Sequence, residues 1–359
     1  MNMRLGRFGK QEAASAVGIA ALISGTFSLN VGDAFAQGNV SYAAAVAGAL
    51  LGLLLLRLLD WSMGRLEGAD LCDLLTEGIG PLLSLPFTLG LVLAAALPLF
   101  RFSLAMERYI FVEANYEPVV LYLLLVLLPM VLSGMECIAR MAKLLLAPGV
   151  LAIILTLLLA APAFDTSHLF PLFSPGFSAF LTQSSQALFR FLPPGVALYA
   201  VGRGCQGREN IRCGVRRGLL LGGLGAAGML FGLGLTFFGP DMASLSAPVY
   251  CMTMAARQER LGLRLDMLVL FLWVMTGLAV AAFYTYAGAL LLCRALRVED
   301  IRPVGALLAL GVVSLVLLFN FDSDGVLAFV RLAYRQGHLL FLLPMGLLMV
   351  QALIHRRLK

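Results

Sequence analysis

The chain contains ten long apolar stretches that carry few charges and are separated by short polar loops. A helix that crosses about 30 Å of hydrocarbon needs roughly 20 such residues. The stretches are continuous and rich in Leu, Ala and Gly, and they lack the alternation of barrel strands. The sequence therefore predicts an all-α membrane protein with about ten transmembrane helices. The predicted spans are 11–30, 42–59, 79–100, 119–134, 144–162, 177–201, 215–238, 265–293, 303–320 and 339–354.

The composition excludes two other classes of protein. Of the 359 residues, 60% are apolar and 13% are charged, whereas about 25% of the residues in soluble domains are charged. A cytosolic enzyme needs more charge on its surface, and a disordered chain needs lower hydrophobicity. Ten spans leave only short loops, so we expect a single transmembrane domain over residues 1–359.

The positive charges predict the orientation in the membrane. Most of the 26 Lys and Arg residues fall on the side shared by the two termini, so the positive-inside rule places both termini in the cytoplasm. The same charges explain the net charge of +6 without a nucleic-acid partner. Ala34-Phe35-Ala36 resembles a signal-peptidase site, and cleavage there would leave nine spans. We favour a retained first span, because an even number of spans suits a two-fold repeat.

Catalytic and metal-binding residue types are scattered. The six cysteines form no CxxC pair, and His168, His338 and His355 lie at separate membrane edges. A zinc site or a catalytic triad needs such groups close together. We therefore expect no enzyme activity, no metal and no cofactor.

The seventh stretch contains a glycine motif with two interpretations. Gly223, Gly225 and Gly228 spell GxGxxG, which indicates dinucleotide binding only between a strand and a helix. Inside a membrane span, small residues spaced three or four apart allow helices to approach closely. We therefore interpret this motif, like Gly48 and Gly52 in the second stretch, as helix packing.

Two stretches carry residues that interrupt helices. Ser24-Gly25-Thr26 lies in the first stretch and Pro193-Pro194-Gly195 in the sixth, where two prolines remove two backbone donors. Transporters built from inverted repeats bind ligands between two broken helices near the midplane. The pattern predicts two inverted five-helix repeats, about 11–162 and about 177–354, with helices 1 and 6 broken and a ligand at these six residues. Ordinary kinks are the alternative.

Polar side chains within the spans give a second indication of a site. Arg190 is the deepest charge in the predicted topology, and Tyr284 and Tyr286 lie in the middle of the eighth stretch. An ionisable group in the membrane usually faces a cavity or a partner. We expect Arg190 to be an intramembrane charge and the two tyrosines to close the ligand pocket. Snorkelling of the arginine and ordinary packing of the tyrosines remain the alternatives.

Several short motifs occur in order along nearly the whole chain. They are Gln11, Glu77-Gly78-Ile79-Gly80, Gly134-Met135-Glu136-Cys137-Ile138-Ala139-Arg140, Phe164-Asp165, Leu169-Phe170-Pro171, Arg264-Leu265-Asp266, Trp273, Tyr284-Thr285-Tyr286 and Leu343-Pro344. In this order and spacing the chain resembles the B subunit (GerAB-type) of bacterial spore-germination receptors. That family is a branch of the amino acid–polyamine–organocation transporter superfamily.

The resemblance implies a LeuT-like fold and a small germinant, usually an amino acid, bound in a central pocket. It also implies the A and C subunits of the germinant receptor as partners and the spore inner membrane as the location. An amino-acid permease of the same fold, coupled to ions or protons, is the alternative function. The predicted spans contain no mid-span acidic residue to carry protons, which favours the receptor. The ligand's identity does not follow from the resemblance.

Overall fold

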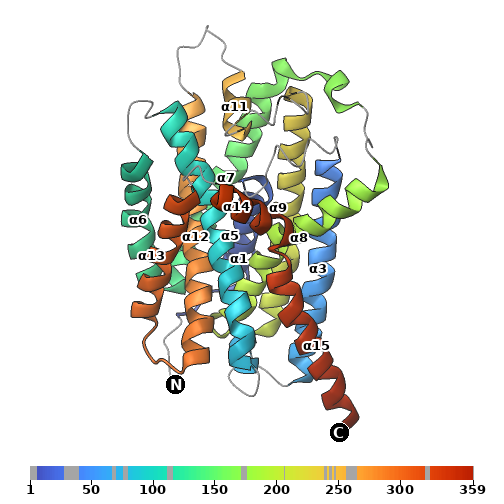
Figure 1. The fold of residues 1–359 in the computed structure, drawn as a ribbon, viewed down its shortest axis with the longest axis vertical. Helices are drawn as coiled ribbons and strands as arrows, with labels where there is room; N and C mark the ends of the chain where they lie inside the picture. Colours follow the sequence, from blue (N-terminus) through green and yellow to red (C-terminus); the bar gives the residue numbers. More distant parts are fainter. Residues whose placement is uncertain are drawn as a thin grey trace.

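Long helices run side by side along the length of the molecule (Figure 1). The computed structural model describes residues 6–27, 40–66, 70–75, 80–110, 116–170, 176–205, 207–237, 241, 245, 248–255, 265–319 and 324–358. Within these ranges the long helices are α1 (Lys10–Phe27), α3 (Ser41–Arg65), α5 (Gly80–Tyr109), α6 (Tyr116–Leu132), α7 (Met135–Ala160), α8 (Phe177–Ala200), α9 (Arg208–Thr236), α12 (Leu265–Leu296), α13 (Ile301–Phe319) and α15 (Leu339–Leu358).

Short elements connect the long helices. They are α4 (Leu71–Leu74), α11 (Pro248–Ala255), α14 (Asp324–Gln336) and three 3₁₀ helices at Ala161–Ala163, Thr166–Leu169 and Gly202–Gly204. The described residues form no strand, and a single parallel bridge joins Phe8 to Cys205. Each predicted span thus overlaps one long helix in the described part of the chain, with ends that differ by up to nine residues.

Seven helices in the described part of the chain are long and apolar enough to cross a membrane. They are Ser41–Arg65, Gly80–Tyr109, Met135–Ala163, Arg208–Thr236, Met267–Leu296, Ile301–Phe319 and Ala328–Ile354, the last of which includes parts of α14 and α15. A shorter apolar helix covers Glu117–Leu132. The chain is therefore a multi-pass membrane protein. Helices α1 and α8 do not meet this criterion, because they are rich in small and polar residues. Both are largely buried by neighbouring helices instead of facing lipid.

The packing divides the helices into a buried set and a lipid-facing set. The most extensive contacts are between α1 and α9 and between α5 and α12. Gly218 and Gly222 let α9 approach the backbone of α1. Of the glycines in the predicted packing motif, Gly223 lies against Ala49 and Gly225 against Leu22, but Gly228 meets no described atom within 4 Å. Helices α6, α7 and α13 instead expose large leucines such as Leu125, Leu144 and Leu307, which suits contact with acyl chains.

The predicted helix breaks are wrong for the described residues. Ser24-Gly25-Thr26 is helical, because α1 continues to Phe27, and residues 28–39 lie outside the described part. Helix α8 runs through Pro193 and Pro194 without interruption. Prolines are tolerated in membrane helices where neighbours satisfy the freed backbone groups. Here α8 is enclosed by α1, α3, α5, α9 and α12, which hold it in helical form.

Helix directions follow from contacts at one end of the bundle. The Phe8 amide, just before α1, donates a hydrogen bond of 3.0 Å to the Gly204 carbonyl oxygen, just after α8. The start of α1 therefore lies beside the end of α8, and these two helices are antiparallel. The last turns of α15 lie at the same end, at the bottom of Figure 1.

Candidate ligand-binding site

Arg190 lies near the middle of α8 and is almost completely buried. Its exposed fraction is 4%. Its Nη1 donates a hydrogen bond of 3.3 Å to the carbonyl oxygen of Gly25. None of the ion pairs among the described residues includes Arg190. A guanidinium has five N–H donors and requires acceptors for them, so Arg190 has donors to spare for a bound anion.

Gly25 provides this carbonyl from the last described turn of α1. A Cβ on Gly25 would lie 2.5 Å from the Ala226 Cβ and 3.2 Å from the Phe191 Cζ. Glycine is therefore needed here for α1, α8 and α9 to meet.

Ser24 and Tyr284 join α1 to α12 beside this point. The Ser24 Oγ and the Tyr284 hydroxyl oxygen are 2.9 Å apart and share a hydrogen bond. Both side chains are buried, with exposed fractions of 1% and 0%. The structure thus brings Ser24, Gly25, Arg190 and Tyr284 together on three helices, and we call these four residues the Arg190 centre.

The remaining predicted site residues point to other neighbours. The Thr26 hydroxyl donates to the Leu22 carbonyl oxygen at 2.8 Å within its own helix. A Cβ on Gly195 would meet Leu56 of α3 at 2.2 Å, so this part of α8 packs on α3. Tyr286 interacts with the backbone of Met135 at the start of α7. Pro193 and Pro194 are buried within α8.

A network of ion pairs at the end of the bundle where α9 begins was not predicted. Asp60, near the end of α3, accepts from the Arg208 Nε at 2.9 Å and from the Arg212 Nε at 2.6 Å. The sequence signal was available, because Asp60 directly follows the apolar stretch 42–59 and is the only carboxylate within α3. Counting Arg208 and Arg212 for topology does not reveal this partner.

A second carboxylate pair lies beside that network. Arg203 Nε is 3.1 Å from the Asp70 Oδ2, and Arg203 also pairs with Asp73. Asp70 is buried, and its side chain accepts from the Asp73 amide at 2.8 Å, which caps α4. Burial, and then the charge of Asp73, raise the pKa of Asp70 to about 6.

Comparison with solved structures identifies the fold. A Na+-coupled sialic acid symporter in a substrate-bound outward-open state has a TM-score of 0.65 at 13% identity, over 95% of this chain and 79% of that one. Mhp1, a nucleobase-cation-symport-1 family transporter in a closed conformation, has a TM-score of 0.65 at 13% identity, over 99% of this chain and 95% of that one. A manganese transporter from Eremococcus coleocola has a TM-score of 0.57 at 14% identity, over 96% and 76%.

Comparison of sequences identifies the family. No curated protein sequence matches the chain. A family model described as spore germination protein matches residues 38–216, which run from the start of α3 into α9. The chain therefore belongs to the spore germination protein family and has the fold of membrane transporters.

Proposed function

We propose that this chain is the subunit of a spore germinant receptor that binds a small carboxylate-bearing germinant, such as an amino acid, at the Arg190 centre. The observation that carries the proposal is the buried guanidinium of Arg190, which has no acidic partner among the described residues. A buried charge without a counter-ion costs several kcal/mol. A ligand carboxylate offsets that cost with two parallel hydrogen bonds, a geometry that arginine favours.

Two inverted five-helix repeats, about 11–162 and about 177–354, form the scaffold in this proposal. The packing supports it when α1, α3, α5, α6 and α7 are matched in order to α8, α9, α12, α13 and α15. The contact of α1 with α9 then corresponds to that of α8 with α3, and the contact of α7 with α12 to that of α15 with α5. The antiparallel directions of α1 and α8 suit an inverted repeat.

Signalling follows from a preference of the ligand for one conformation. A ligand shifts an equilibrium only by its difference in affinity for the two states. The Arg190 centre spans α1, α8 and α12, so its occupation changes how these helices meet. The A and C subunits of the receptor read that change in the spore inner membrane, with both termini of this chain in the cytoplasm.

Replacing Arg190 tests the proposal. Arg190→Gln removes the charge, and we expect two opposite effects on the purified protein. The thermal stability without ligand rises, because the unpaired buried charge is gone. The stabilisation by the active amino acid, found by testing a panel of amino acids, disappears, because affinity falls about 30-fold or more.

Two controls make the test specific. Arg302→Gln removes an exposed arginine at the start of α13 and leaves ligand binding unchanged. The amide derivative of the active amino acid lacks the carboxylate and does not stabilise the wild-type protein. Equal stabilisation by the amide, or stabilisation retained in Arg190→Gln, would contradict a carboxylate at Arg190.

An amino-acid permease coupled to ions or protons is the second candidate function. It is favoured by the symporters among the solved structures that share the fold. Uptake of labelled amino acid by this chain alone in proteoliposomes distinguishes the two. Concentrative uptake driven by a sodium or proton gradient supports the permease and excludes a pure receptor.

A further inference from the structure

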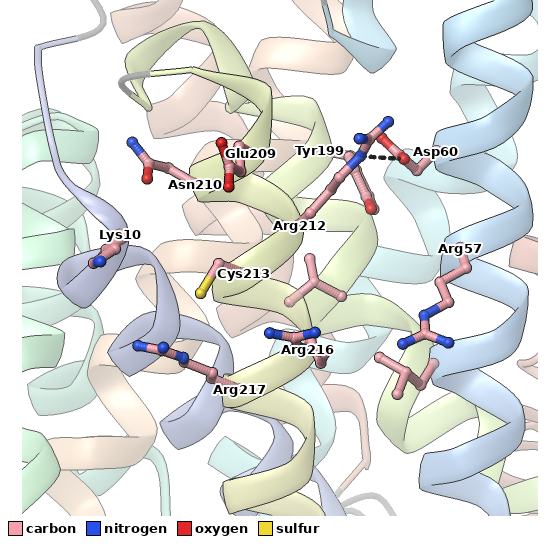
Figure 2. Close-up of a pocket in the computed structure, with 12 residues that line it drawn as sticks. Lys10, Arg57, Asp60, Tyr199, Glu209, Asn210, Arg212, Cys213, Arg216 and Arg217 are labelled. Atoms are coloured by element: carbon pink, nitrogen blue, oxygen red, sulfur yellow. Dashed lines mark hydrogen bonds and ion pairs between the residues drawn. The ribbon is translucent and has the colours of Figure 1, made fainter.

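A cavity of about 450 Å³ opens at the end of the bundle where α1 and α9 begin and α3 approaches its end (Figure 2). It is distant along α1 from the Arg190 centre, because Lys10 lines the cavity and Gly25 lies in the last described turn of that helix. Its walls combine charged groups with a few apolar ones. The lining residues used below are Lys10, Arg57, Asp60, Glu209, Arg216 and Arg217.

Positive charge exceeds negative charge in this cavity. Five of the lining side chains are basic and two are acidic. The basic ones are Lys10, Arg57, Arg212, Arg216 and Arg217. Asp60 is already paired with Arg208 and Arg212. Among the residues that the structure describes, Lys10, Arg57, Arg216 and Arg217 form no ion pair. Such a surplus of positive charge in a concave site attracts anions.

Two arginines face the same space from different helices. Figure 2 shows Arg57 reaching from α3 toward α9, where Arg216 lies, while Arg217 extends toward α1, and both Arg57 and Arg216 line the cavity. Guanidinium groups bind phosphate oxygens through paired hydrogen bonds. The arrangement therefore suits a phosphate-type anion held between Arg57 and Arg216.

An exposed apolar surface leads from the cavity toward the middle of the membrane. Leu54 and Leu50 lie three and seven residues before Arg57, on the same face of α3, and each is 54% exposed. On α9, Leu220 and Leu224 lie four and eight residues after Arg216 and are 42% and 66% exposed. Both pairs are on the bilayer side of their arginine, because α3 ends and α9 begins at this end of the bundle.

We propose that this cavity binds a phosphate-type anion, and that the anion is the headgroup of an anionic phospholipid whose acyl chains lie on the exposed leucines of α3 and α9. Basic pockets between transmembrane helices on the cytoplasmic side are typical sites for anionic headgroups. A free phosphate ion would use the arginines but not the leucines. The proposal is independent of the germinant and of the Arg190 centre.

The test compares two double variants that lose equal charge. Arg57→Gln with Arg216→Gln removes the two facing arginines. Arg65→Gln with Arg302→Gln removes two exposed arginines that do not line the cavity. The purified full chain in a neutral detergent is titrated with short-chain phosphatidylglycerol, short-chain phosphatidylcholine or inorganic phosphate, and the unfolding temperature is recorded.

We expect phosphatidylglycerol to stabilise the wild-type protein and phosphatidylcholine to have little effect. Each arginine near the membrane surface contributes about fivefold in affinity for an anionic lipid. Binding of phosphatidylglycerol should therefore weaken about 25-fold in the cavity variant and remain unchanged in the control variant. If the cavity variant does not fold, the two single variants supply the same test at about fivefold each.

Three results would overturn the proposal in distinguishable ways. Equal affinity of the cavity and control variants for phosphatidylglycerol would exclude the cavity as the site. Equal stabilisation by phosphatidylcholine would show that the leucines bind lipid without recognising its charge. Stabilisation by inorganic phosphate as strong as by phosphatidylglycerol, and lost in the cavity variant, would replace the lipid with a free phosphate.

Discussion

Replacing Gly222 by alanine tests whether α1 and α9 contact one another backbone to backbone. A Cβ at this position would lie 2.4 Å from the Gly18 carbonyl oxygen and 2.6 Å from the Ala21 Cβ. Favourable contacts need about 3.5 Å, so α1 must move away by about 1 Å. The nearest atom belongs to the backbone, so a change of rotamer does not relieve the overlap. Overpacking of this kind costs about 1–3 kcal/mol of unfolding free energy.

Gly228 on the same helix is the matched control. A Cβ at Gly228 would meet no described atom within 4 Å. Alanine in a helix interior is more favourable than glycine by up to about 1 kcal/mol, so Gly228→Ala is expected to be neutral or stabilising. The gain in helix propensity is common to both variants, so they should differ by the overpacking cost of about 1–3 kcal/mol in unfolding free energy.

Unfolding by SDS in mixed micelles, followed by circular dichroism, measures this difference. Gly222→Ala should unfold at a lower SDS fraction than the wild-type protein, and Gly228→Ala at the same or a higher fraction. A difference between the variants below about 0.5 kcal/mol, less than one ordinary packing change, would refute the backbone contact between α1 and α9.

Three further predictions concern polar groups and use the same unfolding assay. Asp60→Asn should lower the unfolding free energy by about 2 kcal/mol, a value between those of exposed and buried ion pairs. The control Glu136→Gln, at the exposed pair with Arg140, should lower it by less than about 1 kcal/mol. Equal losses in the two variants would contradict the role of Asp60. Tyr284→Phe should lower the unfolding free energy by about 1–3 kcal/mol, because it leaves the Ser24 hydroxyl buried without its partner. The double variant Tyr284→Phe with Ser24→Ala should lose less than the sum of the two single losses. Additive losses would contradict a hydrogen bond between the two side chains. The pKa of Asp70 is raised from 3.8 to about 6 in the folded state, so the stability that protonation provides is lost as the pH rises through about 6. The unfolding free energy should fall by up to about 3 kcal/mol between pH 4 and pH 7. If Asp70→Asn shows the same dependence of stability on pH as the wild-type protein, the effect belongs to another group.

The positions of the helices could be predicted from the sequence because membrane spans have a fixed length and composition. Whether the helices continue through Ser24-Gly25-Thr26 and Pro193-Pro194 could not be predicted from the sequence. A proline pair removes two donors from a helix, but whether the helix unwinds depends on the neighbours that surround it. Those neighbours, α1, α3, α5, α9 and α12 around α8, are set by the tertiary arrangement and not by the local sequence.

Part of the Arg190 centre was also predictable. The depth of Arg190 within an apolar stretch indicated a buried charge, and the position of Tyr284 within its stretch indicated a group facing inward. The hydrogen bonds of Arg190 to Gly25 and of Ser24 to Tyr284 join residues 165 and 260 positions apart in the chain. No spacing rule reaches that far, because such contacts depend on which helices become neighbours.

The close approach of α1 and α9 has a mechanical consequence. At Gly218 and Gly222 the nearest atoms of α1 include backbone atoms, which cannot change rotamer to absorb a displacement, and close-packed interiors transmit strain. We therefore expect the two helices to move together, with Gly25 in the last described turn of α1 and the basic cavity at Lys10 and Arg216 near the start of both helices. If the two proposed sites are coupled through these helices, each ligand changes the binding free energy of the other by the same amount, and the lipid composition of the membrane would then set the ligand concentration at which the protein responds.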